Sequence, residues 1–311
     1  MDTRRLTSFI KIVDTGSVSR AADLLNIAQP ALSQQLAALE AYFKQKLVLR
    51  GQQGIIPTDA GRALYRHAQS IVRQVEHARA DIMRFGQELS GGVSVGLSPF
   101  TAGSTLCLSL LRAVQDRHPG ILLHINQSFG QVYSELIMTG RLEVAIIHGA
   151  GPLKGVRFLP LMVERFFLVV AESMCPPAVD GTTSVEALAG LPLLLPPRYN
   201  FVRKAVELAF TRTRGTPRLA AEIESIDGLR DAVAAGLGAT ILPWSVANQV
   251  AVPGRSVIQA IANPVIEDTV SLCTSDYLPL SAAAEGVHEI LLELASGIVT
   301  NSAWPGVRPV I

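Results

Sequence analysis

The chain has 311 residues, of which 49% are hydrophobic and 17% charged, and its formal net charge is +1 at pH 7. This size allows two or three domains with substantial cores, and the charge gives no indication of a protein that coats DNA without sequence preference. The charge is unevenly spread, because residues 1–70 carry nine Lys and Arg against five acids. Such asymmetry indicates a modest phosphate-binding module joined to a near-neutral body.

Targeting and redox signals are missing from the sequence. No apolar stretch reaches the roughly 18 residues of a membrane-spanning helix, and the polar N-terminus has no secretion signal, so we expect a cytoplasmic protein without membrane contact. Cys107, Cys175 and Cys273 stand far apart, with neither a CxxC spacing nor a histidine cluster. We expect three small buried residues, no disulfide or zinc site, and no cofactor.

Residues 19–39 predict two short helices joined by a tight turn. Ser19 is placed as the N-cap of a first helix that ends at Leu25, and residues 26–28 form the turn. Gln29-Pro30 begins the second helix, where the missing N–H of proline has no effect. The pattern predicts a helix-turn-helix, which offers one helix to the DNA major groove; the alternative is a helical hairpin in an ordinary core.

The second of these helices has two distinct faces. A buried face is predicted from the spacing of Leu32, Leu36, Leu39 and Phe43. The opposite face carries Pro30, Gln34, Ala37, Ala38 and Ala41. Gln34 can donate and accept hydrogen bonds together, which matches the N6/N7 edge of adenine. We therefore predict that Gln34 reads a base.

A small hairpin is predicted after the helices. Residues 47–50 and 55–56 are strand-like and flank Gly51-Gln52-Gln53-Gly54. Such a hairpin would form a wing beside the two helices. Arg50 stands where this wing would reach a phosphate or the minor groove, although an arginine at a turn is often only solvated.

A long helix with a narrow apolar seam follows. Thr58 is its predicted N-cap, Asp59 lies in its first turn, and no proline follows until Pro99. The seam alternates spacings of four and three: Leu64, Ala68, Ile71, Val75, Ala78, Ile82, Phe85 and Leu89. A stripe this narrow predicts dimerisation through a partner helix; the alternative is a helix that folds back on its own chain.

The order of these motifs resembles the LysR-type transcriptional regulators. The resemblance is carried by residues 21–25, 29–40, 49–50 and 57–61. It implies a winged helix-turn-helix, a linker helix and a two-lobed regulatory domain like periplasmic binding proteins. It also implies DNA contacts at Gln29, Pro30, Ser33, Gln34 and Arg50. We add Ser19 to these expected DNA-binding residues. Ala37 and Ala38 stand where many members have longer polar side chains, so more of the recognition would depend on DNA shape.

From Gly91 the pattern changes to alternating strands and helices. Residues 93–98, 103–117, 121–128, 132–139 and 142–148 predict a βαβαβ unit with parallel strands. A second lobe is predicted from Val163, with strands at 166–171, 191–195 and 239–242 and helices at 184–188, 201–211 and 226–235. Segments 269–274 and 281–295 would return to complete the first lobe.

The predicted fold class is therefore α/β behind a winged helix-turn-helix. The expected boundaries are 1–58 for the DNA-binding domain, 59–90 for the linker and dimerisation helix, 91–162 with 266–300 for lobe I, 163–265 for lobe II, and 301–311 for a frayed tail.

A ligand cleft is predicted beyond the carboxyl ends of the strands, where helix N-termini converge. The candidate residues are Ser98, Pro99, Phe100, Thr101, Ser128, Phe129, His148, Pro196, Arg198, Asn200, Ser225 and Ile226. Hydroxyl groups and helix N-termini favour a small anion. The alternative is that these Ser and Thr side chains only cap helices and that no effector exists.

Enzyme motifs fail on their context. Ser94 matches G-x-S-x-G but lies inside a predicted strand, and Gly236-Leu237-Gly238 lacks the third glycine of a dinucleotide site. We predict a non-enzymatic, sequence-specific activator or repressor that binds promoter DNA as a homodimer or homotetramer, with RNA polymerase and a small effector as further candidate partners. A solute-binding protein and a coiled-coil adaptor without DNA binding are the alternatives.

Overall fold

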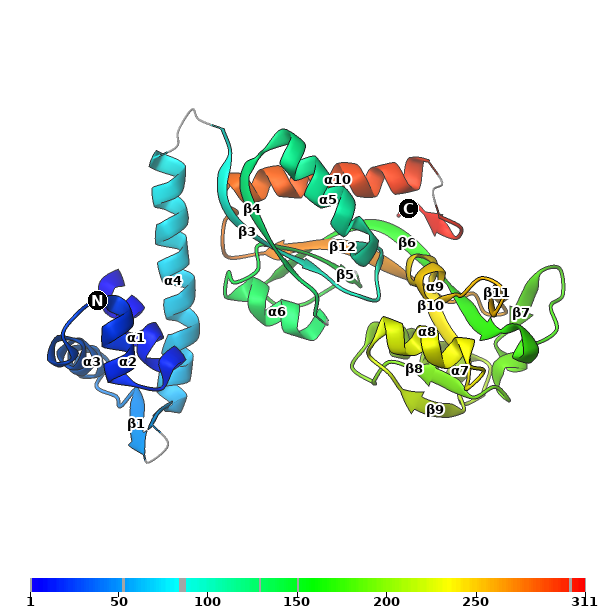
Figure 1. Ribbon diagram of the computed structural model, residues 1–311, viewed down its shortest axis with the longest axis horizontal. Coiled ribbons are helices and arrows are strands. Elements are labelled where there is room, and N and C mark those ends of the chain that lie inside the picture. The colour runs from blue at the N-terminus through cyan, green and yellow to red at the C-terminus, as the bar shows by residue number, and fades with distance from the viewer. Residues whose placement is uncertain are drawn as a thin grey trace. The chain divides into compact units, whose positions relative to one another are not determined.

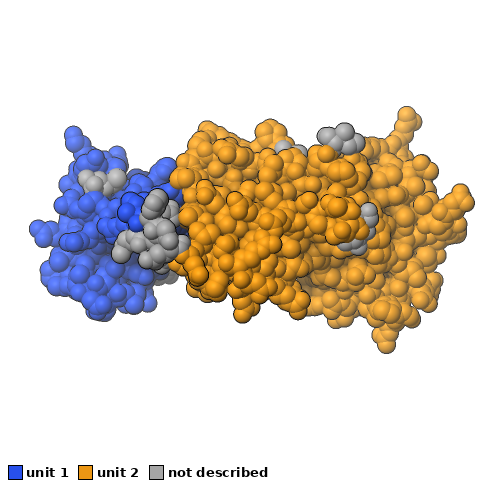
Figure 2. Space-filling view, turned by 90° about the horizontal axis from the view of Figure 1, so that it is seen from above, with its two compact units in different colours: residues 1–87, 138–141 blue, residues 88–137, 142–311 orange. Residues whose placement is uncertain are grey.

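The computed structural model describes residues 2–51, 54–83, 88–128, 130–149, 151–301 and 304–310. The chain divides into two compact units, residues 1–87 with 138–141 and residues 88–137 with 142–311 (Figure 2). Among the described residues, none of the helices is both long and apolar enough to cross a bilayer.

The first unit is a three-helix head with a wing and a long helix. It comprises α1 (Thr3–Thr15), α2 (Val18–Leu25), α3 (Gln29–Phe43), β1 (Val48–Gly51), β2 (Gly54–Pro57) and α4 (Asp59–Met83) (Figure 1). Its core joins α1, α2 and α3 with the first half of α4, through side chains such as Phe9, Ala21, Leu36 and Ala68. Burial of these apolar side chains against one another is what holds the three short helices and α4 together.

The helix ends follow from local sequence. Ser17, and not the predicted Ser19, caps α2, because its side chain accepts a hydrogen bond from the Arg20 N–H. Asn26 ends α2 in the left-handed conformation, at φ 53°. Thr58 caps α4 as predicted, since its hydroxyl oxygen accepts from the Gly61 N–H at 2.9 Å. At Gly61, α4 passes close to the backbone of Leu47, just before β1. A Cβ on this residue would lie 1.9 Å from the Leu47 carbonyl oxygen, so the position requires glycine.

In its described part, the second unit contains a nine-stranded sheet, a two-stranded sheet of β8 and β9, two large hydrophobic cores and a smaller one. Around the first core, which we call lobe I, the strand order is β4-β3-β5-β12-β6. Its elements are β3 (Ser90–Leu97), α5 (Ala102–Arg117), β4 (Gly120–Asn126), α6 (Gly130–Met138), β5 (Val144–His148), β12 (Glu267–Ser275) and α10 (Ala282–Thr300). The parallel β3, β4 and β5 confirm the predicted βαβαβ unit.

Alternation along β5 explains how lobe I is layered. Val144 and Ile146 pack with α5 and α10 in one core, whereas Ala145 and Ile147 pack with Tyr133 of α6 in a smaller core. Because successive side chains of a strand point to opposite faces, the fully buried β5 carries helices on both sides.

Lobe II surrounds the other core. It comprises β7 (Thr182–Ser184), β8 (Leu193–Leu195), α7 (Phe201–Arg212), β9 (Leu219–Glu222), α8 (Ile226–Ala234), β10 (Thr240–Pro243), α9 (Trp244–Val250) and β11 (Ser256–Ala262), with the short 3-10 helices η1 (Glu172–Met174) and η2 (Glu186–Leu188). The sequence predicts α7, α8, β8 and β10 correctly, but it misses β7, β9, β11 and α9.

One strand belongs to both lobes. β6 (Val156–Ala171) pairs with β12 over its first ten residues and with β10 and β11 over its last six (Figure 1). The expected start of a new strand at Phe166 is therefore wrong. The ladder with β12 has an irregularity beside Pro160, which cannot donate a ladder hydrogen bond. The chain returns to lobe I through residues 263–266, where the Phe166 N–H donates to the Ile266 carbonyl.

The expected frayed tail is also wrong. β13 (Val307–Arg308) pairs with β6 at Glu164 and Val163, and the Arg165 N–H donates to the Gly306 carbonyl at 2.9 Å. Trp304 and Val307 pack against the lobe I core. This apolar burial fixes the described part of the C-terminal segment.

The cysteines differ from one another. Cys273 is buried, which raises the pKa of its thiol to about 12. Cys107 is half-buried and Cys175 is exposed, so the expectation of burial is wrong for Cys175.

Candidate nucleic-acid interface and ligand cavities

α3 presents a free polar face to solvent. Leu32, Leu36 and Leu39 are buried as predicted, whereas Phe43 is exposed. On the opposite face Gln29, Pro30, Gln34, Ala37 and Ala41 are exposed, and Ser33 and Ala38 are half-buried. The head therefore supports α3 from one side only, which leaves the side with Gln34 accessible to a groove.

Two adjacent glutamines have different roles. Gln35 points inward, because its Oε1 accepts a hydrogen bond of 2.6 Å from the Ser8 hydroxyl of α1. Gln34 is exposed. Gln35 thus fixes the orientation of α3, a role that the sequence pattern did not reveal, and Gln34 is available for recognition.

The wing lies next to the helices as predicted. β1 and β2 pair antiparallel with Arg50 opposite Ile55 and Gly51 opposite Gly54, while residues 52–53 lie outside the described part. Arg50 is exposed. Ser19 is also exposed, although it lies within α2 and not at its cap.

Glu40 attaches the wing to α3. Its Oε1 accepts from the Leu47 N–H at 2.9 Å, and its Oε2 lies 2.8 Å from the Lys46 ammonium. Burial raises the pKa of Glu40, but the hydrogen bonds from Lys46, Leu47 and Val48 outweigh it and hold the pKa below its usual value. The charged carboxylate therefore stabilises the junction.

This junction predicts a pH-dependent effect. Glu40→Gln is expected to speed amide exchange of segment 45–50 by about tenfold at pH 7, because a hydrogen bond to a charged acceptor is worth roughly 1.5 kcal/mol. Since the folded-state pKa is depressed, this stability exists above the unfolded pKa and is lost as pH falls through the folded one. Hydrogen–deuterium exchange should thus show variant and wild type converging in acid. Asp23→Asn, at an exposed carboxylate of α2, is the control; a gap independent of pH would contradict the prediction.

The seam of α4 is divided between two environments. Ala68 is fully buried and Leu64 half-buried in the core of their own unit, so for these two the fold-back alternative is correct. Ile71 and Ile82 are 37% and 77% exposed, Ala78 is exposed and Val75 half-buried. Phe85 lies outside the described residues. Leu89 is not helical and packs against the lobe I core.

A cavity of about 350 Å³ lies between the two lobes, within the size range of small-molecule sites. We call it the interlobe cavity. The structure brings three predicted effector residues to its wall: Ser98, His148 and Asn200. The other lining residues are Ser134, Ile147, Gly149, Gly151, Pro152, Leu153, Phe158, Tyr199, Phe201 and Lys204.

Other predicted effector residues have structural roles. Phe100 is fully buried in the lobe II core, so it joins the lobes and cannot contact a ligand. Thr101 caps α5 and Ser225 caps α8. The Ser128 N–H donates to the Tyr133 hydroxyl at 2.7 Å. The capping alternative is thus correct for Thr101 and Ser225, and Asn200, although it lines the cavity, also caps α7.

The remaining predicted residues lie away from this wall. Arg198 is exposed, and its Nε lies 3.7 Å from the Glu207 carboxylate, which is paired more closely, at 2.7 Å, with Arg203. Pro99, Pro196 and Ile226 do not line the interlobe cavity. Phe129 lies outside the described residues.

His148 is the centre of a buried charged cluster that the sequence did not reveal. Its Nε2 lies 3.2 Å from Glu164 and its Nδ1 lies 3.6 Å from Asp268, and its ring stacks on Phe201 at 3.8 Å. Burial lowers the pKa of His148, but the two carboxylates outweigh it and raise the pKa above its usual value. Glu164 also accepts from the Ser245 hydroxyl of α9, so the cluster links both lobes.

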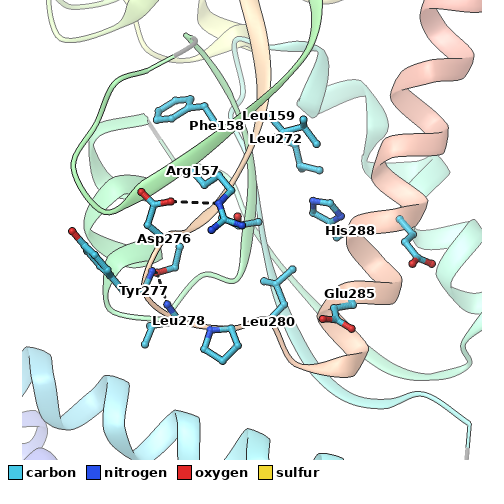
Figure 3. A pocket seen from close by; sticks show the side chains of 14 residues that line it. Arg157, Phe158, Leu159, Leu272, Asp276, Tyr277, Leu278, Leu280, Glu285 and His288 are labelled. Carbon is cyan, nitrogen blue, oxygen red and sulfur yellow. Dashed lines mark hydrogen bonds and ion pairs between the residues drawn. The ribbon is translucent and has the colours of Figure 1, made fainter.

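Another cavity of about 640 Å³, the α10 cavity, lies between α10 and the ends of β6 and β12. Figure 3 shows Arg157 turned toward Asp276, at 3.4 Å, with Glu285 and His288 on the neighbouring helix. Burial lowers the pKa of His288. None of the predicted effector residues that the structure describes lines this cavity.

Comparisons with known proteins agree with this architecture. Residues 3–62 match the family described as bacterial regulatory helix-turn-helix protein, lysR family, and residues 86–296 match the LysR substrate binding domain. The nitrogen assimilation regulatory protein nac of Klebsiella aerogenes is 40% identical over 95% of this chain and 96% of its own, and that of Escherichia coli is 39% identical over 98% and 99%. Within the family, residues 4–6 and 27–35 carry the resemblance to this nitrogen assimilation regulatory protein in particular.

Solved structures share the fold. A full-length OxyR variant from Pseudomonas aeruginosa superposes with a TM-score of 0.74 at 23% identity, covering 95% of this chain and 94% of that one. CbnR complexed with its target DNA superposes with a TM-score of 0.66 at 22% identity, covering 95% of this chain and all of that chain (100%).

Proposed function

Given that the chain belongs to the LysR family of DNA-binding transcriptional regulators, we propose that it reads promoter DNA through Gln34, assisted by Gln29, Pro30, Ser33 and Arg50. The observation that carries this proposal is the exposed α3 face, on which Gln34 is the long amide near the middle. One bidentate contact to adenine supplies roughly 1–3 kcal/mol of discrimination. Ala37 and Ala38 add little, so one copy of α3 is a weak reader and a selective site needs several copies.

Self-association would supply those copies. The exposed half of the α4 seam, defined by Ile71, Val75, Ala78 and Ile82, recurs at helical spacing and is narrow enough for one partner helix. We propose that two chains pair through it as a homodimer. The other half of the seam is occupied by the chain's own core.

Exposed leucines of α5 and of the edge strand β4 support a homotetramer. Leu108 and Leu111 of α5 and Leu122 of β4 are exposed on lobe I, and β4 is the edge strand of the sheet. Exposed apolar patches at a sheet edge commonly mark interfaces. Because an isologous dimer uses one patch, two distinct patches allow pairs to assemble into a tetramer.

The regulated process is proposed from the relatives. Two proteins named for the regulation of nitrogen assimilation share about 40% identity with nearly the whole chain. We propose that this regulator likewise controls genes of nitrogen assimilation, acting in the cytoplasm on promoters with RNA polymerase as a partner.

An effector is proposed for the interlobe cavity. Ser98 and Ser134 on lobe I face Asn200 and Lys204 on lobe II around a space of about 350 Å³. Polar groups from both lobes that converge on one space suit a small anion, which would favour one arrangement of the lobes. Titration calorimetry with small metabolite anions tests it: Ser98→Ala should lose the binding, and Arg112→Ala, outside the cavity, should keep it.

Genome-wide footprinting tests the regulatory proposal. Protected sites are expected upstream of nitrogen assimilation genes, and affinity for them should fall steeply with salt because phosphate contacts release counterions. Equal affinity for all fragments at moderate salt would refute sequence-specific reading. Specific sites at unrelated genes would refute only the nitrogen assignment.

A further inference from the structure

A cavity of about 640 Å³ lies beside α7, next to the return of the chain from lobe II to lobe I. We call it the α7 cavity. Among the described lining residues, it has His148, Gly149, Phe201 and Lys204 in common with the interlobe cavity. Its own walls are one face of α7, residues 265–268 and Arg308 of β13.

The α7 face has a regular order of charges. Lys204, Leu208 and Arg212 stand at successive i, i+4 positions and all three line the cavity. The two cations are therefore separated by about 12 Å along the helix axis. Lys204 and Arg212 are exposed, and neither has an ion-pair partner among the residues that the structure describes.

The space between the two cations is apolar. Leu208 is 53% exposed, and Val265 on the facing segment is 42% exposed. Ala205 and Ala209 also line the cavity. Large apolar side chains left half open to water beside a concave surface favour a ligand with an apolar body.

The remaining charges do not cancel these cations. Glu267 is already paired with Arg308 at 2.7 Å, and Asp268 lies against His148. His148, fully buried at the wall, has no hydrogen-bond partner of good geometry for either ring nitrogen among the described residues. The cavity is thus cationic.

We infer that the α7 cavity binds a small dianion whose two acidic groups are separated by an apolar spacer, such as a medium-chain α,ω-dicarboxylate. One carboxylate lies at Lys204, the other at Arg212, and the spacer covers Leu208 and Val265. The site shares Lys204 with the interlobe cavity, so its ligand would compete with the proposed effector for that ammonium group, and it is separate from the DNA-reading face of α3. Because it joins α7 of lobe II to the return segment and to Arg308 of lobe I, its ligand would favour one arrangement of the lobes.

Titration calorimetry on the full-length protein with suberate as the probe tests the inference. Suberate should bind with one site per chain. Octanoate, with the same length but one carboxylate, should bind about tenfold more weakly, the effect of one charge-assisted contact of roughly 1.4 kcal/mol. Succinate is too short to reach both cations and should bind no better than octanoate.

Matched variants locate the ligand. Arg212→Gln should lower suberate affinity about tenfold and octanoate affinity less, which abolishes the preference for the dianion. Arg214→Gln, an equal charge removal at an exposed residue outside the cavity, should leave both affinities unchanged. Absence of suberate binding at millimolar concentration, an equal effect of both arginine variants, or a loss in Ser98→Ala but not in Arg212→Gln would each overturn the inference.

Discussion

Replacing Ile71 and Ile82 together by glutamate is expected to convert the protein into monomers. Full burial of an exposed isoleucine contributes roughly 1.5–3 kcal/mol. Because Ile82 is 77% and Ile71 37% exposed in the single chain, two copies together lose about 3–7 kcal/mol. Like charges placed across the seam add repulsion. Analytical ultracentrifugation at micromolar concentration should show the change in mass.

The consequence for DNA binding should be equally large. Two linked readers bind with an effective concentration that separate readers lack, so the variant should lose at least about a hundredfold in affinity for a two-half-site promoter. Its affinity for a single half-site should hardly change. Val179→Glu, an equivalent change at a 74% exposed side chain in lobe II, is the control. A variant that sediments as wild type would show that the exposed seam has another use.

Gln34→Ala is expected to remove most of the sequence preference. The variant should lose about 1–3 kcal/mol at its preferred site, a factor of roughly 5 to 150, while its affinity for unrelated DNA stays nearly the same. Competition gel shifts with specific and random duplexes at fixed salt measure both quantities.

The neighbouring glutamine provides a matched comparison. Gln35→Ala removes the hydrogen bond from Ser8 and should weaken specific and unrelated DNA alike, because it loosens the head. If Gln34→Ala also lowered both affinities equally, Gln34 would be a structural residue and not a reader.

Local patterns in the sequence predicted the DNA-binding unit well. Leu32, Leu36 and Leu39 recur at helical spacing, and Thr58 is a strong cap, so α3 and the start of α4 follow from short-range rules. The same rules could not show that Ala68 faces its own core while Ile82 faces solvent. That difference depends on where the head ends along α4, which is a tertiary property.

The regulatory lobes show where such patterns fail. Of β6, the sequence predicts only residues 166–171 as a strand. Pro160, Glu164 and Arg165 interrupt the apolar run of its first part, yet Glu164 is fully buried by His148, Ser245 and the α5 N-terminus. These partners are distant in sequence. β13 has only two residues, too few for any periodicity, and Phe100 enters the core of the other lobe.

The shared strand has a consequence for biosynthesis. Lobe I requires β12 and α10, which follow the whole of lobe II in the chain. Because β12 lies between β5 and β6, both β5 and the first part of β6 must wait during translation, each with an unpaired edge, until residues 267–300 have left the ribosome. An unpaired edge invites strand pairing with other nascent chains. Lobe II has nearly contiguous segments and can fold earlier. Synthesis of the chain from Glu267 onward therefore decides whether the sheet of lobe I is completed or the nascent chain aggregates.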